Sequence, residues 1–290
     1  MNMRISIANI FTHLFLLLAL LATASCSDWT DQKTVDIDPQ HAKEQNPELW
    51  ARYMETLRTY RQSKHFVTYG SFDNSAEKSK NEGDYLRSLP DSLDIVTPTH
   101  PESLTSYDCE DILLLQEKSI KLLYLVDYTA QMPALTDAAK LGAWLDKAVA
   151  AASQLGMNGF AIKGTPLYGG TEAEQAARRE AAKLIVSKLS TAVGDGKLLV
   201  FEGDPAFMDA ADLNKLDYVV LKLLLSAKIN EKLVDEEGEK LDAVTEMTNR
   251  VVSLGPVGGL AIYALGDDYY HTKMNYETSR LAIQIMNPSK

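Results

Sequence analysis

The feature that most constrains the fold is a regular alternation of short apolar runs with segments of helical periodicity. Seven of the runs contain β-branched residues and have the length of strands; they span residues 65–70, 93–98, 120–128, 159–164, 197–203, 216–225 and 258–265. Segments with helical spacing lie between most of them. Strands that alternate with helices in this way predict a parallel sheet with right-handed crossover connections.

The length and rhythm of the alternating region favour an α/β barrel of the TIM (β/α)8 type over a doubly wound sheet. A dinucleotide-binding doubly wound sheet carries a glycine-rich phosphate loop after its first strand, whereas this chain has TYGSFDN at residues 68–74. The count of strands is one short, because residues 226–257 have a mostly helical pattern. Either KLV (232–234) or RVVSL (250–254) supplies a poor seventh strand, or the barrel is irregular or incomplete there.

Residues at the ends of the helical segments predict where the helices begin and end. Pro47 suits the first turn of a helix that continues through PELWARYMETLRTYRQSK. Thr136 and Thr171 are potential N-caps of two longer helices, which Gly156 and Gly194 are suited to end.

The N-terminus has the layout of a secretory signal. Arg4 precedes a long apolar run that ends in small residues before Cys26. The sequence TASC resembles a bacterial lipobox, although Thr23 replaces the usual Leu. A membrane-spanning anchor is the alternative, but no cluster of charges follows the apolar run. We therefore predict an exported lipoprotein that is lipidated (palmitate) at Cys26 and held in the outer membrane, at the cell surface or on the periplasmic face.

This interpretation divides the chain into three parts. Residues 1–25 are predicted to be the signal peptide. Residues 26–45 are polar and without periodicity, which predicts a tether, and residues 46–290 are predicted to form one barrel domain.

The composition narrows the function classes. A formal net charge of −11 argues against a nucleic-acid partner, because the phosphate backbone would meet like charge. The histidines and cysteines show no metal-ligand spacing, so we predict no metal and no cofactor. Cys109 is the one cysteine left in the predicted mature chain, and we interpret it as a buried, inert thiol.

The order of several segments resembles family 18 glycoside hydrolases, in particular a lipoprotein branch similar to endo-β-N-acetylglucosaminidases. The resemblance runs over most of residues 47–288, with a gap at about 226–256, and the segments are YMETLRTYRQSKHFVTYG, LPDSLDIVTP, GMNGFAIKG and GGLAIYALGDDYY. It implies a TIM barrel and a ligand that contains N-acetylglucosamine.

The catalytic pattern of that family is absent from this chain. The family's fourth strand carries D-G-x-D-x-D-x-E, in which the Glu protonates the glycosidic oxygen and the preceding Asp orients the substrate's acetamido group. The four acidic positions fall on Asn158, Ala161, Lys163 and Thr165. A threonine hydroxyl cannot act as a general acid near neutral pH. The resemblance thus implies a degenerate catalytic motif, which predicts a pseudoenzyme.

Other residues at the predicted carboxyl ends of the strands are candidates for ligand binding. Carboxylates there can bind sugar hydroxyls or replace the lost acids, and aromatic rings can pack on sugar faces. The candidates are Tyr69, Asp127, Tyr128, Glu202, Tyr263, Asp267 and Asp268. The alternative is that the carboxylates cap helices or bind loop amides and that the tyrosines belong to the core.

Three functions remain open at this point. The first is a non-catalytic lipoprotein that binds N-acetylglucosamine-containing glycans. The second is a divergent or weak glycoside hydrolase that uses Glu202 or an Asp at the barrel end. The third is a structural subunit of an outer-membrane glycan-uptake complex, beside neighbouring uptake proteins.

Overall fold

The computed structural model describes residues 42–74, 79, 81–132, 135, 137–221, 226–235, 237–254 and 257–288. The predicted signal peptide, Cys26 and most of the predicted tether lie outside these residues. Contacts divide the chain into residues 1–50 and 51–290. The first unit contains α2 (Ala42–Gln45) and the start of α3 (Pro47–Gln62), and the second contains the remaining elements.

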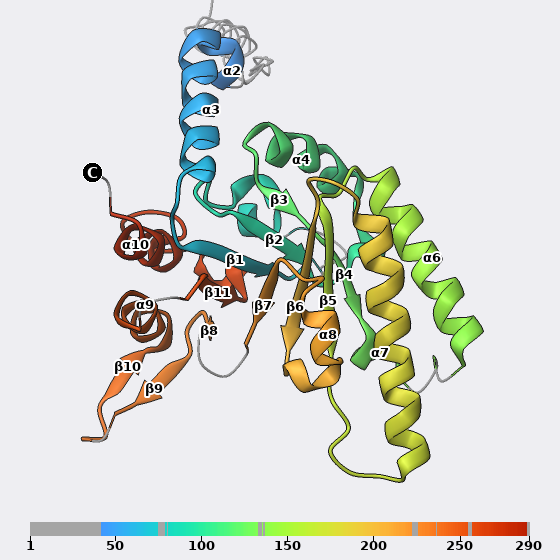
Figure 1. Ribbon diagram of the computed structural model, residues 1–290. Helices are drawn as coiled ribbons and strands as arrows, with labels where there is room; N and C mark the ends of the chain where they lie inside the picture. Colours follow the sequence, from blue (N-terminus) through green and yellow to red (C-terminus); the bar gives the residue numbers. More distant parts are fainter. Residues whose placement is uncertain are drawn as a thin grey trace, which may run out of the picture. The chain divides into compact units, whose positions relative to one another are not determined.

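The core of the second unit is built from parallel strands in two sheets (Figure 1). One sheet has the order β3-β2-β1-β11-β8 and the other β4-β5-β6-β7. The strands are β1 (Val67–Phe72), β2 (Ile95–Pro98), β3 (Lys121–Leu122), β4 (Tyr124–Asp127), β5 (Gly159–Gly164), β6 (Leu198–Gly203), β7 (Tyr218–Val220), β8 (Ser226–Lys228) and β11 (Gly259–Tyr263).

The two sheets are joined through β3 and β4. Only Leu123 separates these strands, and its N–H donates to the carbonyl oxygen of Val96 on β2 at 3.0 Å. β3 pairs with β2 and β4 pairs with β5, so the two segments are halves of one strand that changes partner. The predicted TIM-type α/β fold is confirmed.

The strand missing from the sequence count is β8. Among its described residues, the run 216–225 contributes the three-residue β7, and β8 follows it and pairs in parallel with β11. KLV instead forms β9 (Lys232–Val234), an antiparallel partner of β10 (Lys240–Asp242) outside the two parallel sheets. Most of RVVSL lies in α9 (Ala243–Ser253), where Val244, Met247 and Val251 are buried at helical spacing.

Helices pack along the outer faces of the strands (Figure 1). The longer ones are α4 (Ser106–Glu117), α6 (Ala138–Gln154), α7 (Glu172–Val193), α9 and α10 (Glu277–Met286). The short ones are α5 (Tyr128–Gln131), α8 (Ala210–Leu213) and the 3-10 turns η1 (Glu82–Asp84), η2 (Leu86–Ser88), η3 (Pro101–Ser103), η4 (Pro205–Phe207) and η5 (Leu265–Asp268). On β5, Phe160 and Ile162 face the helical layer, while Ala161 lies in the separate cluster inside the barrel.

Most of the predicted helix ends are confirmed. Pro47 is the first residue of α3, Thr171 caps α7 in a capping box with Glu174, and Gly194 ends α7 with φ 61°. The cap of α6 is Asp137, which accepts hydrogen bonds from two backbone amides of the first turn. Thr136, the predicted cap, lies outside the described residues.

The prediction for Cys109 is wrong, because its side chain is exposed. The buried positions of α4 are Asp108, Asp111, Ile112 and Leu115, which follow the spacing of one helix face. Cys109 lies beside that face rather than on it. A separate observation concerns the helices as a group: within the described residues, none combines the length and the apolar character that crossing a membrane requires.

Candidate functional site

Three charged side chains form a row at the carboxyl ends of three neighbouring strands. Asp127 on β4 is the register partner of Lys163 on β5, which is in turn the partner of Glu202 on β6. Register partners in a parallel sheet project to the same face. The residues two positions earlier are Leu125, Ala161 and Val200, and all belong to the cluster inside the barrel. We call Asp127, Lys163 and Glu202 the charged row.

The first two members of the row form an ion pair. Lys163 Nζ lies 2.6 Å from Asp127 Oδ2, with side chains 37% and 19% exposed respectively. The other oxygen of Asp127 accepts a hydrogen bond from the backbone N–H of Ala130 at 2.9 Å and so caps α5. Asp127 therefore pairs with Lys163 through one oxygen and caps α5 through the other, and both side chains of the ion pair remain partly exposed to solvent.

The third member, Glu202, is buried and is held from the opposite side of the barrel. Its Oε2 accepts a hydrogen bond from Tyr263 on β11 at 3.0 Å, and its Oε1 accepts one from Tyr69 on β1. Burial, the negative charge of Glu202 and these hydrogen bonds raise the pKa values of both phenols. The phenols therefore remain protonated donors, and both oxygens of Glu202 are engaged as acceptors.

The other degenerate motif positions have structural roles. The side-chain oxygen of Asn158 accepts from the backbone N–H of Leu122 at 3.0 Å, which ties the start of β5 to β3. The hydroxyl of Thr165 lies 3.2 Å from that of Thr129, and its carbonyl oxygen accepts from Arg178 at 2.7 Å. None of these groups can supply a carboxylic proton.

The remaining predicted residues do not join the charged row. Tyr128 is buried against Phe207, with the Arg178 guanidinium 5.7 Å from its ring centroid. Asp268 is fully buried and accepts hydrogen bonds from the N–H and hydroxyl of Ser279 in the first turn of α10. Asp267 is exposed in η5. Tyr128 and Asp268 thus follow the structural alternative.

The sequence alone does not identify Lys163 as a candidate for ligand binding, but in the structure it lies between two carboxylates. In the sequence it marks only a lost carboxylate, whereas in the structure it is the central member of the row. The available signal was the two-residue period of the strand, which places Lys163 on the same face as Ala161. Within the residues that the structure covers, no group of three or more His, Cys, Asp or Glu side chains is arranged to hold a metal ion.

Comparisons with known proteins agree with this architecture. Residues 30–141 match the model of glycoside hydrolase family 18, BT1044-like. Among solved structures, BT1044 in a selenomethionine form with one Glu replaced by Gln gives a TM-score of 0.68 at 16% identity, covering 86% of this chain and 96% of that one. An endo-β-N-acetylglucosaminidase from Cordyceps militaris gives 0.59 at 17% identity, covering 81% of this chain and 95% of that one.

A family 18 chitinase from Pseudoalteromonas aurantia gives a TM-score of 0.50 at 12% identity, over 76% of this chain and 99% of that one. No curated protein sequence matches the chain. At these identities the solved structures establish the fold, which is that of family 18 barrels. The family model covers the N-terminal part of the chain, up to the start of α6.

Proposed function

We propose that this protein is a family 18 glycoside hydrolase-like barrel that binds N-acetylglucosamine-containing glycans at the carboxyl ends of its strands and does not cleave them. The observation that carries the proposal is the ion pair between Lys163 and Asp127, with 2.6 Å between Nζ and Oδ2. It places a cation at the inward position of β5 where the resembled family has a carboxylate.

The remaining groups do not replace the missing acid. A general acid must hold a proton that it can donate to the glycosidic oxygen. Thr165 offers only a hydroxyl, which is shared with Thr129. Glu202 is buried, and its two oxygens accept hydrogen bonds from Tyr69 and Tyr263, so it is held inside the barrel by its own contacts.

The same groups suit the binding of a neutral sugar. The partly exposed Lys163 ammonium donates hydrogen bonds, and the partly exposed Asp127 carboxylate accepts them. A sugar hydroxyl can accept a hydrogen bond from the ammonium and donate one to the carboxylate. A second structure of the Cordyceps militaris enzyme, a variant with TM-score 0.58 to this chain, is a complex with fucosyl-N-acetylglucosamine-Asn. That ligand supports the choice of glycan class.

The proposal also covers where the protein is located in the cell and which proteins lie beside it. We propose that the chain is exported, lipidated at Cys26 and retained in the outer membrane, where it holds glycans beside neighbouring uptake proteins. Support comes from the sequence alone, because residues 1–41 lie outside the described part of the chain. Labelling of expressing cells with a fatty-acid analogue, with Cys26→Ala as the control, tests the lipid attachment.

Glycan binding is tested by calorimetric titration of the full chain with chitooligosaccharides, fucosyl-N-acetylglucosamine-Asn and a high-mannose N-glycan. Lys163→Met should weaken the binding about tenfold, since a hydrogen bond to a charged group contributes about 1.5–3 kcal/mol. Lys197→Gln is the matched control, because Lys197 is an exposed lysine that precedes β6 at the other end of the strand. The absence of binding to every ligand at millimolar concentration would overturn the proposal.

A divergent hydrolase is the second candidate, favoured by the position of Glu202 inside the barrel beside Lys163. Incubation with a labelled N-glycoprotein distinguishes the two functions. The proposed function predicts no glycan release above the rate without protein. Release that disappears in Glu202→Gln or Asp127→Asn would establish the hydrolase instead.

A further inference from the structure

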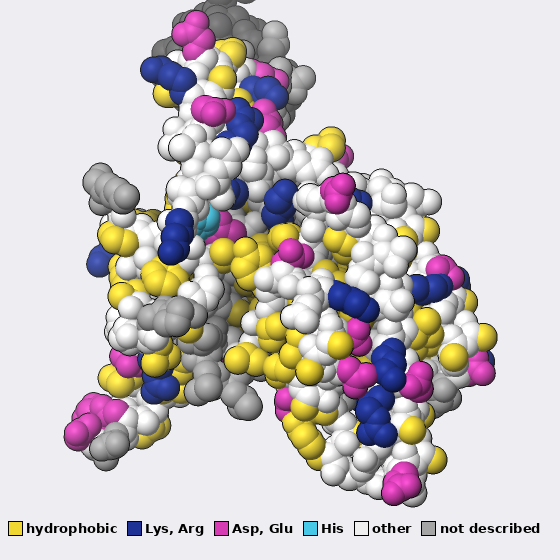
Figure 2. Space-filling model, viewed as in Figure 1, with side chains coloured by type: hydrophobic (Ala, Val, Ile, Leu, Met, Phe, Trp, Pro, Cys, Tyr) yellow, Lys and Arg dark blue, Asp and Glu magenta, His cyan; other side chains and the backbone are white. Residues whose placement is uncertain are grey.

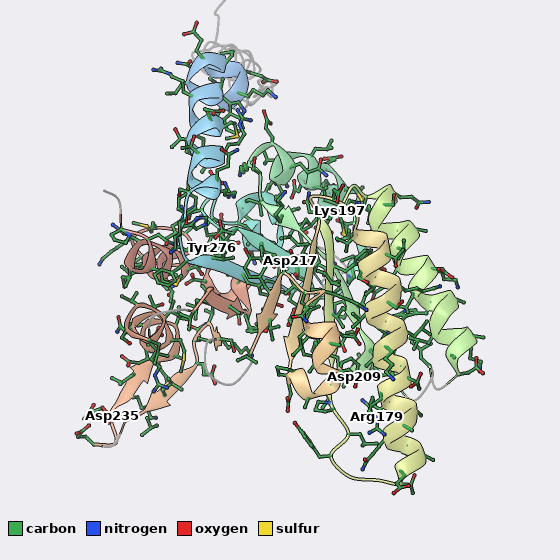
Figure 3. The ribbon with its side chains drawn as sticks, viewed as in Figure 1. Arg179, Lys197, Asp209, Asp217, Asp235 and Tyr276 are labelled. Carbon is green, nitrogen blue, oxygen red and sulfur yellow. The ribbon has the colours of Figure 1, made fainter. Side chains whose placement is uncertain are left out.

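A cleft of about 480 Å³ opens at the amino ends of the strands, opposite the charged row. Its lining comes from the segment before β1 and from the starts of β2, β3, β6 and β7. Figure 3 distinguishes the two ends: Lys197 precedes β6 at this end, and Asp209 follows β6 at the other. The lining residues with basic or acidic side chains are Arg58, Arg61, Lys64, His65, Asp94 and Lys121.

The cleft concentrates positive charge in an acidic protein. Four of the lining residues are Lys or Arg and one is an Asp, whereas the whole chain has a formal net charge of −11. Of the four cations, Arg58 is neutralised by Glu55 at 2.9 Å. Lys64 and Lys121 form no ion pair with any residue that the structure describes. Two ammonium groups are therefore available at the cleft.

The third available cation, Arg61, is fixed in place without being neutralised. Its guanidinium donates to the backbone carbonyl oxygens of Leu57 and Leu93, at 3.3 and 2.7 Å, and to that of Asp91. These acceptors are uncharged, so the positive charge persists. Its Nε is buried and has no hydrogen-bond partner in the described part of the chain. The carboxylates of Asp94 and Asp91 act on its charge from nearby, but neither forms an ion pair with it in the described part of the chain. A rigidly held guanidinium is a typical element of a site for a carboxylate or a phosphate.

The single carboxylate of the cleft, Asp94, is already occupied. It accepts hydrogen bonds from the backbone N–H of Thr68 at 2.8 Å and from His65 Nε2 at 2.9 Å. The hydrogen bond to Asp94 raises the pKa of His65. When the imidazole is protonated, its positive charge and the negative charge of Asp94 balance each other. Asp94 therefore acts on the charges of both His65 and Arg61, and its hydrogen bonds go to Thr68 and His65 rather than to Lys64 or Lys121.

The rest of the lining combines the uncharged polar residues Gln62, Ser63 and Ser119 with an apolar part. Val67, Ile95 and Leu198 contribute aliphatic side chains, and the ring of Tyr218 is 37% exposed. Figure 2 shows basic side chains close to apolar ones on the surface below α3. The volume lies in the range of pockets for small ligands, which combine apolar walls with a few polar groups.

We propose that this cleft binds a small acidic sugar, either a sugar carboxylate or a sugar phosphate. The acidic group meets Arg61, Lys64 and Lys121, and the sugar ring packs on Tyr218 and the aliphatic wall. The site is independent of the glycan site at the opposite end of the barrel, in its residues and in the charge of its ligand.

The test uses three ligands that share one ring: glucose, glucuronate and glucose 6-phosphate. Each is titrated calorimetrically into the full chain at low and at high salt. Binding of one or both anions, together with at least about tenfold weaker binding of glucose, is expected, and added salt should weaken the binding of the anions. A preference for glucuronate assigns a carboxylate ligand, and a preference for glucose 6-phosphate assigns a phosphate ligand.

Variants localise the binding. Lys64→Gln and Lys121→Gln should each weaken anion binding about fivefold or more, because each removes one charge from the acidic group. Lys197→Gln, near the same end but outside the lining of the cleft, should leave anion binding unchanged. Equal affinity for glucose and the anions, no binding of either anion, or binding that survives the double variant Lys64→Gln/Lys121→Gln would overturn the proposal.

Discussion

Lys163 and Asp127 occupy paired positions on β5 and β4, and Lys163 Nζ lies 2.6 Å from Asp127 Oδ2. On its other side Lys163 is the register partner of Glu202. The charges therefore alternate along the row, with one cation between two carboxylates. This order gives every member of the row an oppositely charged neighbour.

The first prediction concerns the hydrogen bonds that hold Glu202. Tyr263→Phe removes the donor that lies 3.0 Å from Oε2, inside a buried environment. The free energy of unfolding should fall by about 1–3 kcal/mol, because a buried charged acceptor loses a partner. Urea denaturation measures the change.

Tyr168→Phe is the control for this variant, because it also removes one phenolic hydroxyl, but from a side chain that is 75% exposed. A drop in stability of equal size in both variants would contradict the special role of the buried Glu202 contacts.

The second prediction concerns Gly159, the first residue of β5. Its φ is +135°, and a Cβ there would lie 1.9 Å from the carbonyl oxygen of Leu198. Gly159→Ala should therefore destabilise the protein by at least about 3 kcal/mol, through backbone strain and the displacement of β6. Thermal unfolding measures the loss.

Gly258→Ala provides the comparison, since a Cβ at Gly258 meets no atom within 4 Å and its φ lies outside the left-handed range. Its effect should remain within about 0.5 kcal/mol. If both variants unfolded at the same temperature, the close approach of β5 and β6 at Gly159 would be refuted.

The sequence predicted much of β5 and little of the contacts across the barrel. The two-residue period of a strand puts Phe160 and Ile162 on one face of β5 and Ala161 on the other, and in the structure the first face packs against the helices and the second lies inside the barrel. By contrast, Tyr69 and Glu202 are 133 positions apart, and no local pattern indicates that their side chains meet. The sequence also did not indicate which carboxylate is buried and which caps a helix, because carboxylates of both kinds lie at the ends of strands.

The sequence-based prediction of strands was wrong around β7 and β8 for a different reason. The run 216–225 is apolar enough to predict one long buried strand. Of the part of this run that the structure describes, residues 216–221, only Tyr218–Val220 pairs with β6, and Tyr218 and Val219 remain partly exposed. Apolar composition reports a tendency to be buried, whereas the length of a strand depends on the partner available beside it.

The third prediction is a pH dependence that arises from His65. Its hydrogen bond to Asp94 raises its pKa above the usual 6.5, against the opposing effects of burial and of Arg61. A raised pKa means that the folded protein binds the proton more tightly than the unfolded chain. The stabilisation is fully present below about pH 6.5 and is lost as the pH rises through the pKa of the folded state.

Unfolding experiments between about pH 5.5 and 8.5 measure this effect. The free energy of unfolding of the protein should decrease more steeply with pH than that of His65→Gln. Tyr60, whose ring centroid lies 4.4 Å from that of His65, remains protonated in this window, because burial raises its pKa to about 12. Identical slopes for the protein and His65→Gln would refute the assignment.

The last prediction tests the order of charges in the row. Lys163→Asp would place three carboxylates side by side on β4, β5 and β6, with Glu202 buried. Like charges at this spacing repel, so the variant should lose about 1–3 kcal/mol of stability near neutral pH. At about pH 4.5 protonation should relieve part of the repulsion and reduce the loss relative to the unsubstituted protein. Lys163→Asn, which removes the cation without adding a carboxylate, should show a smaller loss with little of this pH dependence. Equal stability of Lys163→Asp and Lys163→Asn at both pH values would contradict this prediction. It would mean that the alternating charges of the row do not contribute to the stability of the protein.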